Sequence, residues 1–111
     1  MKVAVIGSRG LTIDDLGKFL PEKTTEIISG GANGIDTCAR NYAISHNIKL
    51  TEYLPEYDKY GRAAPLKRNV TIVENADIVV AIWDGISHGT KFVINYCQEN
   101  IVPLRVYYIN R

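Results

Sequence analysis

Short apolar runs alternate along this chain with longer stretches in which apolar residues recur every three or four positions. The apolar runs predict β-strands and the longer stretches predict amphipathic helices. Strands are expected at Lys2–Ile6, Thr25–Ser29, Ile48–Tyr53, Asp77–Trp83 and Val102–Ile109, and helices at Thr12–Leu20, Ile35–Ser45, Leu66–Asn75 and Ser87–Asn100. Leu54–Pro65 is expected to be a long loop.

For two of these helices the sequence also predicts an N-cap or an apolar side. Thr12 is the expected N-cap of the first helix, and Pro21 follows its end. The helix at Leu66–Asn75 has Leu66, Val70 and Val73 along one side.

Strands that alternate with helices predict an α/β fold with parallel pairing. Right-handed crossover connections give a doubly wound, Rossmann-like sheet of about five strands with helices on both faces. We expect the strand order 3-2-1-4-5 in a single domain that covers residues 1–111. Ligands of such sheets bind beyond the carboxyl ends of the strands, where the strand order reverses. Three segments are predicted to lie there, namely Gly7–Gly10, Gly30–Asp36 and Trp83–Thr90.

Composition narrows the class of protein. Hydrophobic residues make up 46% of the 111 residues and charged residues 23%, as in a globular domain, and no apolar run is long enough for a membrane helix. The net charge of +1 lacks the basic excess of a protein whose main task is gripping nucleic acid. Cys38 and Cys97 have neither metal-site nor redox spacing, so we expect two buried thiols in a reducing, cytoplasmic setting. No metal, cofactor or membrane partner is expected.

The turn from Gly85 to Thr90 follows a strand and opens a helix. Its backbone N–H groups can converge on an anion that the helix dipole favours, and the hydroxyls of Ser87 and Thr90 can add donors, with Gly89 between them. An ordinary glycine turn with a helix cap is the alternative. Asp84 could accept hydrogen bonds from a base or ribose, or be a common turn aspartate.

Two further glycine turns are predicted to face the same crevice. In Gly7-Ser8-Arg9 the missing side chain lets the backbone approach a ligand, and Arg9 either binds a phosphate or is a plain surface residue. This turn is not the dinucleotide fingerprint. Gly30 and Gly31 precede Asp36, which either binds ribose hydroxyls or complements the helix dipole.

Basic residues gather in the long loop and directly after it. In Lys67-Arg68-Asn69, Arg68 can offer a fork of donors to phosphate and Asn69 can pair with a base or ribose, although a solvated arginine and a backbone cap are the alternative. Lys59, Arg62, Lys67 and Arg68, with two tyrosines among them (Tyr57 and Tyr60), could also contact a nucleic acid.

Taken in order, these motifs resemble the SLOG superfamily, in particular its small YspA-like branch. The resemblance rests on Gly7-Ser8-Arg9, Ser29-Gly30-Gly31-Ala32-Asn33-Gly34-Ile35-Asp36, Arg68-Asn69, Asp77–Trp83 and the turn Gly85-x-Ser87-x-Gly89-Thr90. The stretch Ser29–Asp36 is also similar to a signature of the DNA-processing DprA/Smf proteins. The resemblance implies a Rossmann-like fold, binding of nucleotides or their derivatives and, in several branches, homodimers.

Departures from two related branches restrict the function. The lonely-guy phosphoribohydrolases carry a glutamate where this chain has Val93, and a valine cannot transfer a proton. The DprA/Smf proteins are longer than this core.

Three functions therefore stay open. The leading hypothesis is a sensor that binds a nucleotide or nucleotide-derived phosphate ligand. The second is a hydrolase that cleaves an N-glycosidic or phosphoester bond of such a ligand, with Asp36, Asp84 or Glu56 as acid or base. The third is a module for single-stranded nucleic acid at the basic loop Tyr57–Arg68. A homodimer is expected, through a helix face rich in apolar residues at Val93, Ile94, Tyr96 and Cys97.

Overall fold

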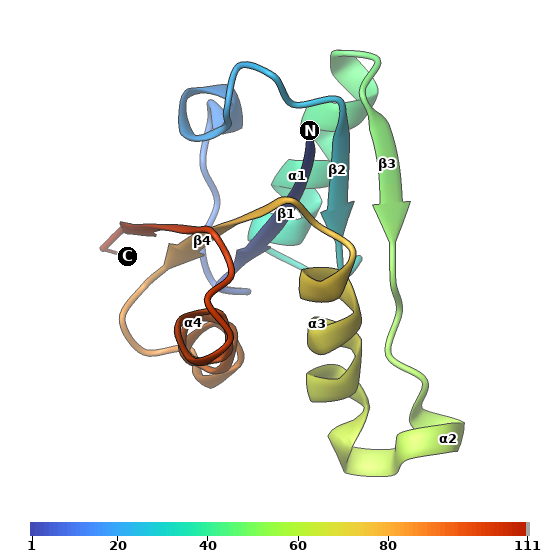
Figure 1. Ribbon diagram of the computed structural model, residues 1–111. Coiled ribbons are helices and arrows are strands. Elements are labelled where there is room, and N and C mark those ends of the chain that lie inside the picture. Colours follow the sequence, from blue (N-terminus) through green and yellow to red (C-terminus); the bar gives the residue numbers. More distant parts are fainter. Residues whose placement is uncertain (111) are drawn as a thin grey trace.

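The computed structural model describes residues 1–110 and contains a five-stranded parallel sheet (Figure 1). The strands are β1 (Lys2–Gly7), β2 (Glu26–Ser29), β3 (Lys49–Glu52), β4 (Ile78–Trp83) and β5 (Leu104–Tyr108). Their order is β3-β2-β1-β4-β5, with every neighbouring pair parallel. The predicted α/β class, strand number and order 3-2-1-4-5 are confirmed.

Helices cover both faces of this sheet. They are α1 (Ile35–Ser45), α2 (Tyr57–Tyr60), α3 (Ala64–Glu74) and α4 (His88–Glu99), and two 3-10 helices complete the list, η1 (Leu16–Phe19) and η2 (Gly61–Ala63). α1 packs on one face, and α3 and α4 pack on the other. None of the helices within residues 1–110 is long and apolar enough to cross a bilayer.

The core follows from the alternation of side chains along the two central strands. Val3 and Val5 of β1 point to the α1 side, whereas Ala4 points to the side of α3 and α4. All three are fully buried. Strands that are buried on both faces read as continuous apolar runs, which explains why β1 and β4 were the easiest strands to predict from the sequence.

The helix predicted at Thr12–Leu20 is wrong except for a single 3-10 turn at Leu16–Phe19. Asp15, not Thr12, stands at its N-cap position, and its side chain makes no capping hydrogen bond. Gly17 lies so close to α1 that an added Cβ would stand 2.8 Å from the Tyr42 hydroxyl. Packing against α1 therefore shapes this segment more than helical periodicity does.

The predicted loop Leu54–Pro65 also differs, because it contains α2 and η2. Gly61 joins these two short helices with a φ of +55°, a conformation that glycine adopts readily. Figure 1 shows α2 beyond the end of α3, away from the sheet.

The buried face of α3 matches the predicted apolar side only at Val73. Leu66 is 41% exposed, whereas Arg68 and Asn69 are buried together with Ile72 and Val73. The alternative of a solvated Arg68 is therefore wrong, because the structure turns both polar side chains inward.

The apolar face of α4 lies in the molecule's own core. Val93 and Cys97 are fully buried against the sheet, and Ile94 is 8% exposed. This face of α4 therefore cannot form a dimer contact, and the homodimer itself stays a prediction. The expectation of two buried thiols holds only for Cys97, since Cys38 is half-buried.

Candidate functional site

A cleft of about 450 Å³ opens at the carboxyl edge of the sheet, between the starts of α3 and α4 and the turns that follow β1 and β2. It brings together ten of the predicted ligand-binding residues from four separate segments. These are Gly7, Ser8, Arg9, Gly30, Asp36, Arg68, Asn69, Ser87, Gly89 and Thr90. The segment Arg68-Asn69 therefore shares one cleft with the glycine turns.

Other predicted residues lie beside this cleft. Gly31 lines a neighbouring hollow of about 230 Å³, and Lys67 and Glu56 line another of about 250 Å³. Neither Asp84 nor Gly85 is among the lining residues of the main cleft in the described part of the chain.

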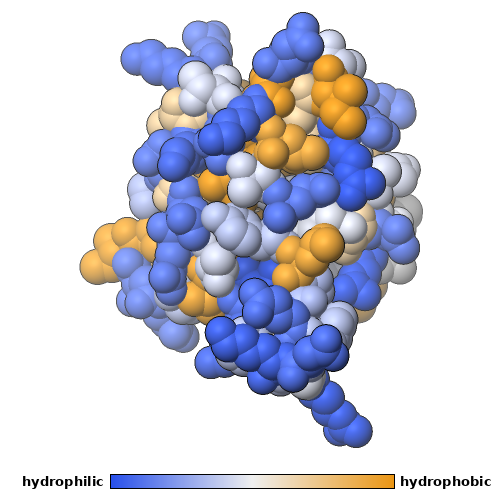
Figure 2. Space-filling model, turned by 90° about the vertical axis from the view of Figure 1, so that its right-hand side faces the viewer, coloured by the Kyte–Doolittle hydropathy of each residue, from blue (hydrophilic) through white to orange (hydrophobic). Residues whose placement is uncertain are grey.

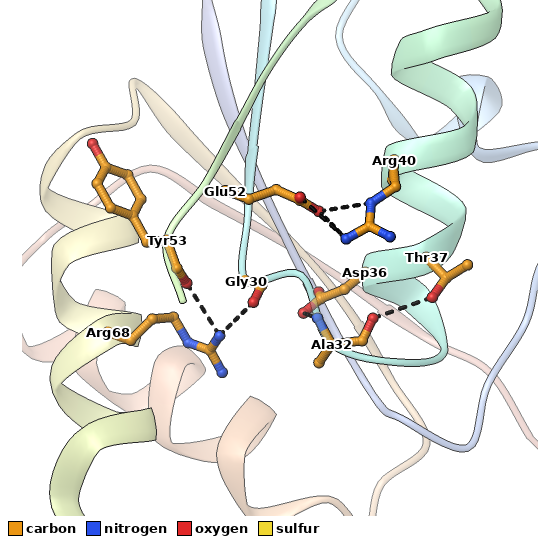
Figure 3. A network of polar contacts seen from close by, with 8 residues as sticks. All are labelled: Gly30, Ala32, Asp36, Thr37, Arg40, Glu52, Tyr53 and Arg68. Atoms are coloured by element: carbon orange, nitrogen blue, oxygen red, sulfur yellow. Dashed lines mark hydrogen bonds and ion pairs between the residues drawn. The ribbon is translucent and has the colours of Figure 1, made fainter. Parts of the chain in front are cut away.

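Arg68 connects the walls of the cleft through hydrogen bonds. Its side chain reaches from α3 to the ends of β2 and β3, where Nη1 donates to the Gly30 carbonyl at 2.7 Å and to the Tyr53 carbonyl at 3.3 Å. Nε donates to Asn69 Oδ1 at 2.9 Å. Figure 3 shows one terminal nitrogen shared by the two carbonyls and the other directed away from them.

That second nitrogen, Nη2, makes no hydrogen bond with any residue between 1 and 110. Arg68 as a whole is only 9% exposed and lines all three hollows named above. Burial lowers the pKa of its guanidinium, and the nearby Asp36 carboxylate partly restores it. A largely desolvated cation with a free donor suits an anionic partner in the cleft.

Asp36 supplies a buried carboxylate at the start of α1. The residue is 8% exposed, and its Oδ2 accepts the backbone N–H of Ala32 at 3.1 Å (Figure 3). Burial raises the pKa of Asp36, while the Ala32 N–H, the neighbouring Ser29 hydroxyl and the positive charges of Arg68 and Arg9 oppose that rise. The result is an acceptor whose protonation differs from that of a surface aspartate.

Ser29 is a site residue that the sequence analysis did not single out. Its hydroxyl lies close enough to Asp36 to lower that carboxyl's pKa, yet its fully buried Oγ has no partner with hydrogen-bond geometry in the described residues. A buried hydroxyl in this state is uncommon in folded proteins. Ser29 is the last residue of the predicted strand Thr25–Ser29, so its place in the motif was the only available signal.

The Gly85 turn is built around Asp84. Its Oδ1 accepts the backbone N–H groups of Ile86 and Ser87, each at 2.9 Å, and Oδ2 lies 3.2 Å from the Ser87 hydroxyl. Two donors that were expected to converge on a ligand anion are thus occupied by the protein's own carboxylate. Gly85, with a φ of +82°, packs against the Tyr108 ring.

The backbone N–H groups that remain available to a ligand belong to the residues directly after Ser87. No hydrogen bond within residues 1–110 uses the backbone N–H groups of His88, Gly89 or Thr90, the first three residues of α4. All three residues line the cleft. An anion at this helix end would therefore meet three N–H groups and the positive end of the helix dipole, with the Asp84 carboxylate nearby as a competing charge.

Ser8 stabilises the floor of the cleft through hydrogen bonds. Its hydroxyl accepts the backbone N–H of Asp84 at 3.1 Å, and its carbonyl accepts from Leu11 and Ile35. The residue is 1% exposed. One serine therefore joins the ends of β1 and β4 to the start of α1.

Two glycines of the cleft lie very close to neighbouring side chains. A Cβ on Gly7 would stand 2.4 Å from the Ile35 Cβ, so β1 and α1 could not come this close with any other residue. A Cβ on Gly30 would meet Arg68 Nη1 at the same distance. Gly7 lies at the cleft as predicted, and its contact with Ile35 is a reason for glycine that the sequence did not show.

An apolar wall lines one side of the cleft. Pro65, Leu66 and Ile72 of α3 contribute to it with Ile6 of β1. Leu66 is 41% exposed, so this wall offers contact area to a ligand. The sequence could not show this, because an apolar residue on a helix predicts core before it predicts a cleft.

The basic residues do not form one surface. Lys59, Arg62 and Lys67 are exposed around α2 and η2, whereas Arg68 is buried in the cleft. The ammonium groups of Lys59 and Lys67 lie 5.1 and 5.9 Å from the centre of the Tyr60 ring. The surface predicted for nucleic acid thus lacks one of its four cations.

Within residues 1–110, no three His, Cys, Asp or Glu side chains come together in a way that could hold a metal ion. The resemblance to the SLOG superfamily stays a prediction. No protein-family model, curated protein or solved structure matches this chain.

Proposed function

We propose that this protein binds a nucleotide or nucleotide-derived phosphate ligand in the cleft and acts as a sensor of it in the cytoplasm. The observation that carries the proposal is the juxtaposition of the free Arg68 Nη2 donor with the open N–H groups of His88, Gly89 and Thr90 in one cleft. Fixed cationic and N–H donors that converge on one space favour a phosphate.

The rest of the cleft fits the other parts of a nucleotide. Leu66 and its apolar neighbours offer a surface for the flat base, and Asp36 offers an acceptor for ribose hydroxyls. A volume of about 450 Å³ lies within the usual range for small-molecule sites. An inorganic anion alone would leave the apolar wall without a partner.

The hollow beside Gly31 extends this site. Arg9, Gly30 and Arg68 line both it and the main cleft, so two guanidinium groups stand at their junction. A ligand longer than a mononucleotide has room to continue there, over Asn33 and Leu54.

A thermal-unfolding screen tests the proposal with nucleotides, the matching nucleosides and inorganic phosphate as separate probes. A nucleotide at about 100 times its Kd adds about 2.7 kcal/mol to the free energy of unfolding. We expect at least one nucleotide to raise Tm more than the nucleoside and phosphate do separately. The proposal fails if no nucleotide shifts Tm and calorimetry finds no heat of binding.

A matched pair of variants locates the site. Arg68→Lys keeps a positive charge but removes the fork of donors, whereas Arg62→Lys makes the same change on η2, outside the cleft. Arg68→Lys is expected to weaken nucleotide binding, and Arg62→Lys is expected to leave it unchanged. Equal affinities for the two variants would place the ligand elsewhere.

A second candidate, hydrolysis of the bound ligand, is favoured by Asp36 alone. Among the described residues that line the cleft it is the one carboxylate, and burial raises its pKa toward the range useful for proton transfer. Glu56 lines the hollow next to Tyr60, and Asp84 is engaged in its own turn. Chromatography of nucleotides after incubation with the protein would detect a released base or phosphate, and Asp36→Asn should abolish such release.

A further inference from the structure

The free edge of the sheet at β5 carries an unpaired row of backbone groups. β5 pairs only with β4 among the described strands. Val79 donates to the Pro103 carbonyl at 2.9 Å, and Ile109 donates to the Trp83 carbonyl at 2.8 Å. Because backbone direction alternates along a strand, the odd-numbered residues face β4 and the N–H and C=O groups of Leu104, Val106 and Tyr108 face outward.

The side chains at this edge are apolar and open to solvent. Val106 is 43% exposed and Tyr108 is 61% exposed. The Tyr108 ring packs on Gly85, and the next residue after that glycine, Ile86, is 69% exposed. Arg105 is the one charged residue within β5.

The opposite edge of the sheet is protected differently. β3 begins with Lys49 and ends with Glu52, and these charges pair with Glu26 at 3.6 Å and with Arg40 at 3.0 Å. Figure 2 looks onto the right-hand side of Figure 1, where β3 lies, and shows mostly hydrophilic side chains with hydrophobic ones in small separate groups. Charged side chains discourage pairing at a free edge, and β5 has much less of this protection.

We propose that β5 pairs with β5 of a second copy of this chain, antiparallel about a two-fold axis at Val106, to give a continuous ten-stranded sheet. Val106 then exchanges both of its backbone hydrogen bonds with its own counterpart, and Leu104 exchanges both with Tyr108 of the second copy. All three outward N–H groups and all three outward carbonyls of each chain are satisfied.

The register follows from the same geometry. A shift that centres the pairing on Arg105 loses two of these hydrogen bonds and sets the two arginines directly opposite each other. Pairing centred on Val106 instead sets Arg105 opposite Tyr107. α4 packs mainly on β4, one strand in from the edge, so two copies of this helix do not meet over the joined strands.

The test is the mass in solution, by sedimentation velocity over a range of concentrations, of the parent chain and two variants. Val106→Pro removes an N–H that points away from β4, so the sheet within one chain keeps its hydrogen bonds. Val106→Lys sets two positive charges against each other at the axis. Both variants should run as monomers at concentrations where the parent runs as a dimer.

Arg105→Lys, which keeps the charge and the strand, is the control and should leave the dimer intact. Amide hydrogen exchange adds a second readout, because dilution of the parent should expose the amides of Leu104, Val106 and Tyr108 and leave that of Tyr107 protected. A parent that is monomeric throughout, or a dimer that persists in both Val106 variants, would overturn the proposal. Should Val106→Pro fail to fold, Val106→Lys decides.

Discussion

Arg68 and Gly30 approach each other so closely that a side chain at position 30 would displace the guanidinium. The guanidinium Nη1 donates to the Gly30 carbonyl at 2.7 Å, and a Cβ at position 30 would stand 2.4 Å from the same nitrogen. The absence of a side chain directly after β2 thus leaves room for the Arg68 guanidinium, which comes from α3.

Gly30→Ala should therefore damage both the fold and the cleft. The added methyl group displaces a buried guanidinium, a kind of overpacking that costs roughly 1–3 kcal/mol. Urea unfolding measures this loss, and calorimetry should show weaker nucleotide binding because Arg68 no longer holds its position. An unfolding curve identical to that of the parent would contradict this account of Gly30.

Gly89→Ala should have the opposite effect on stability. A Cβ there meets no atom within 4 Å, and its backbone does not have a positive φ. Alanine should raise the free energy of unfolding by about 0.4–1 kcal/mol by restricting the unfolded chain. Because Gly89 lines the cleft, the same methyl group should weaken nucleotide binding, and a variant that gains stability with undiminished affinity would remove this helix end from the site.

Arg9→Ala should weaken nucleotide binding and leave the fold unchanged. Arg9 is exposed at the cleft, and its side chain makes no hydrogen bond or ion pair with the described residues. A charge-assisted contact with phosphate is worth roughly 1.5–3 kcal/mol, which calorimetry can resolve. Arg62→Ala serves as the control, since Arg62 is also exposed but lies on η2, outside the cleft. Equal affinities for both variants and the parent would exclude Arg9 from the site.

Asp36→Asn should change how stability depends on pH. Burial raises the pKa of Asp36 in the folded protein above its ordinary value of 3.8. Between that value and the raised pKa the folded state binds more protons than the unfolded state, so the free energy of unfolding contributed by Asp36 falls as pH rises through this interval. Asparagine does not ionise, and its carbonyl can still accept the Ala32 N–H.

The variant should consequently gain stability relative to the parent as pH rises through the same interval, in urea unfolding at a series of pH values. Asp58→Asn, a change at an exposed carboxylate on α2, is the control. A difference between Asp36→Asn and the parent that stays constant with pH, or moves the other way, would show that burial does not control this carboxyl.

The sheet was predictable because its strands are short and strongly apolar. β1 and β4 read as unbroken apolar runs, and the glycine turns after β1 and β2 marked where the strands end. The chain direction and the right-handed crossover rule then left few possible strand orders. Thr12–Leu20 failed because only Leu16–Phe19 forms a turn. The close approach of Gly17 to Tyr42, far along the chain, is a tertiary contact that local periodicity does not report.

The position of the cleft was predictable from the sequence, but the hydrogen bonds within it were not. Gly7 ends β1, and Asp36 and Arg68 lie near the starts of the helices that follow β2 and β3, so all three meet at the carboxyl edge of the sheet. That Arg68 would be buried, or that the Asp84 carboxylate would take the N–H groups of its own turn, depends on side-chain geometry that no residue pattern contains.

Ser8 shows how a survey of tolerated substitutions at this edge could mislead. It lines the cleft, but its hydroxyl and carbonyl are engaged with Asp84, Leu11 and Ile35. Replacing the serine would remove the buried hydrogen bond from the Asp84 N–H, while its main-chain carbonyl would still accept from Leu11 and Ile35. Intolerance at position 8 would therefore report the packing of the floor and not contact with a ligand. Arg9, one residue away and free of such ties, is where selection for the ligand itself would be visible.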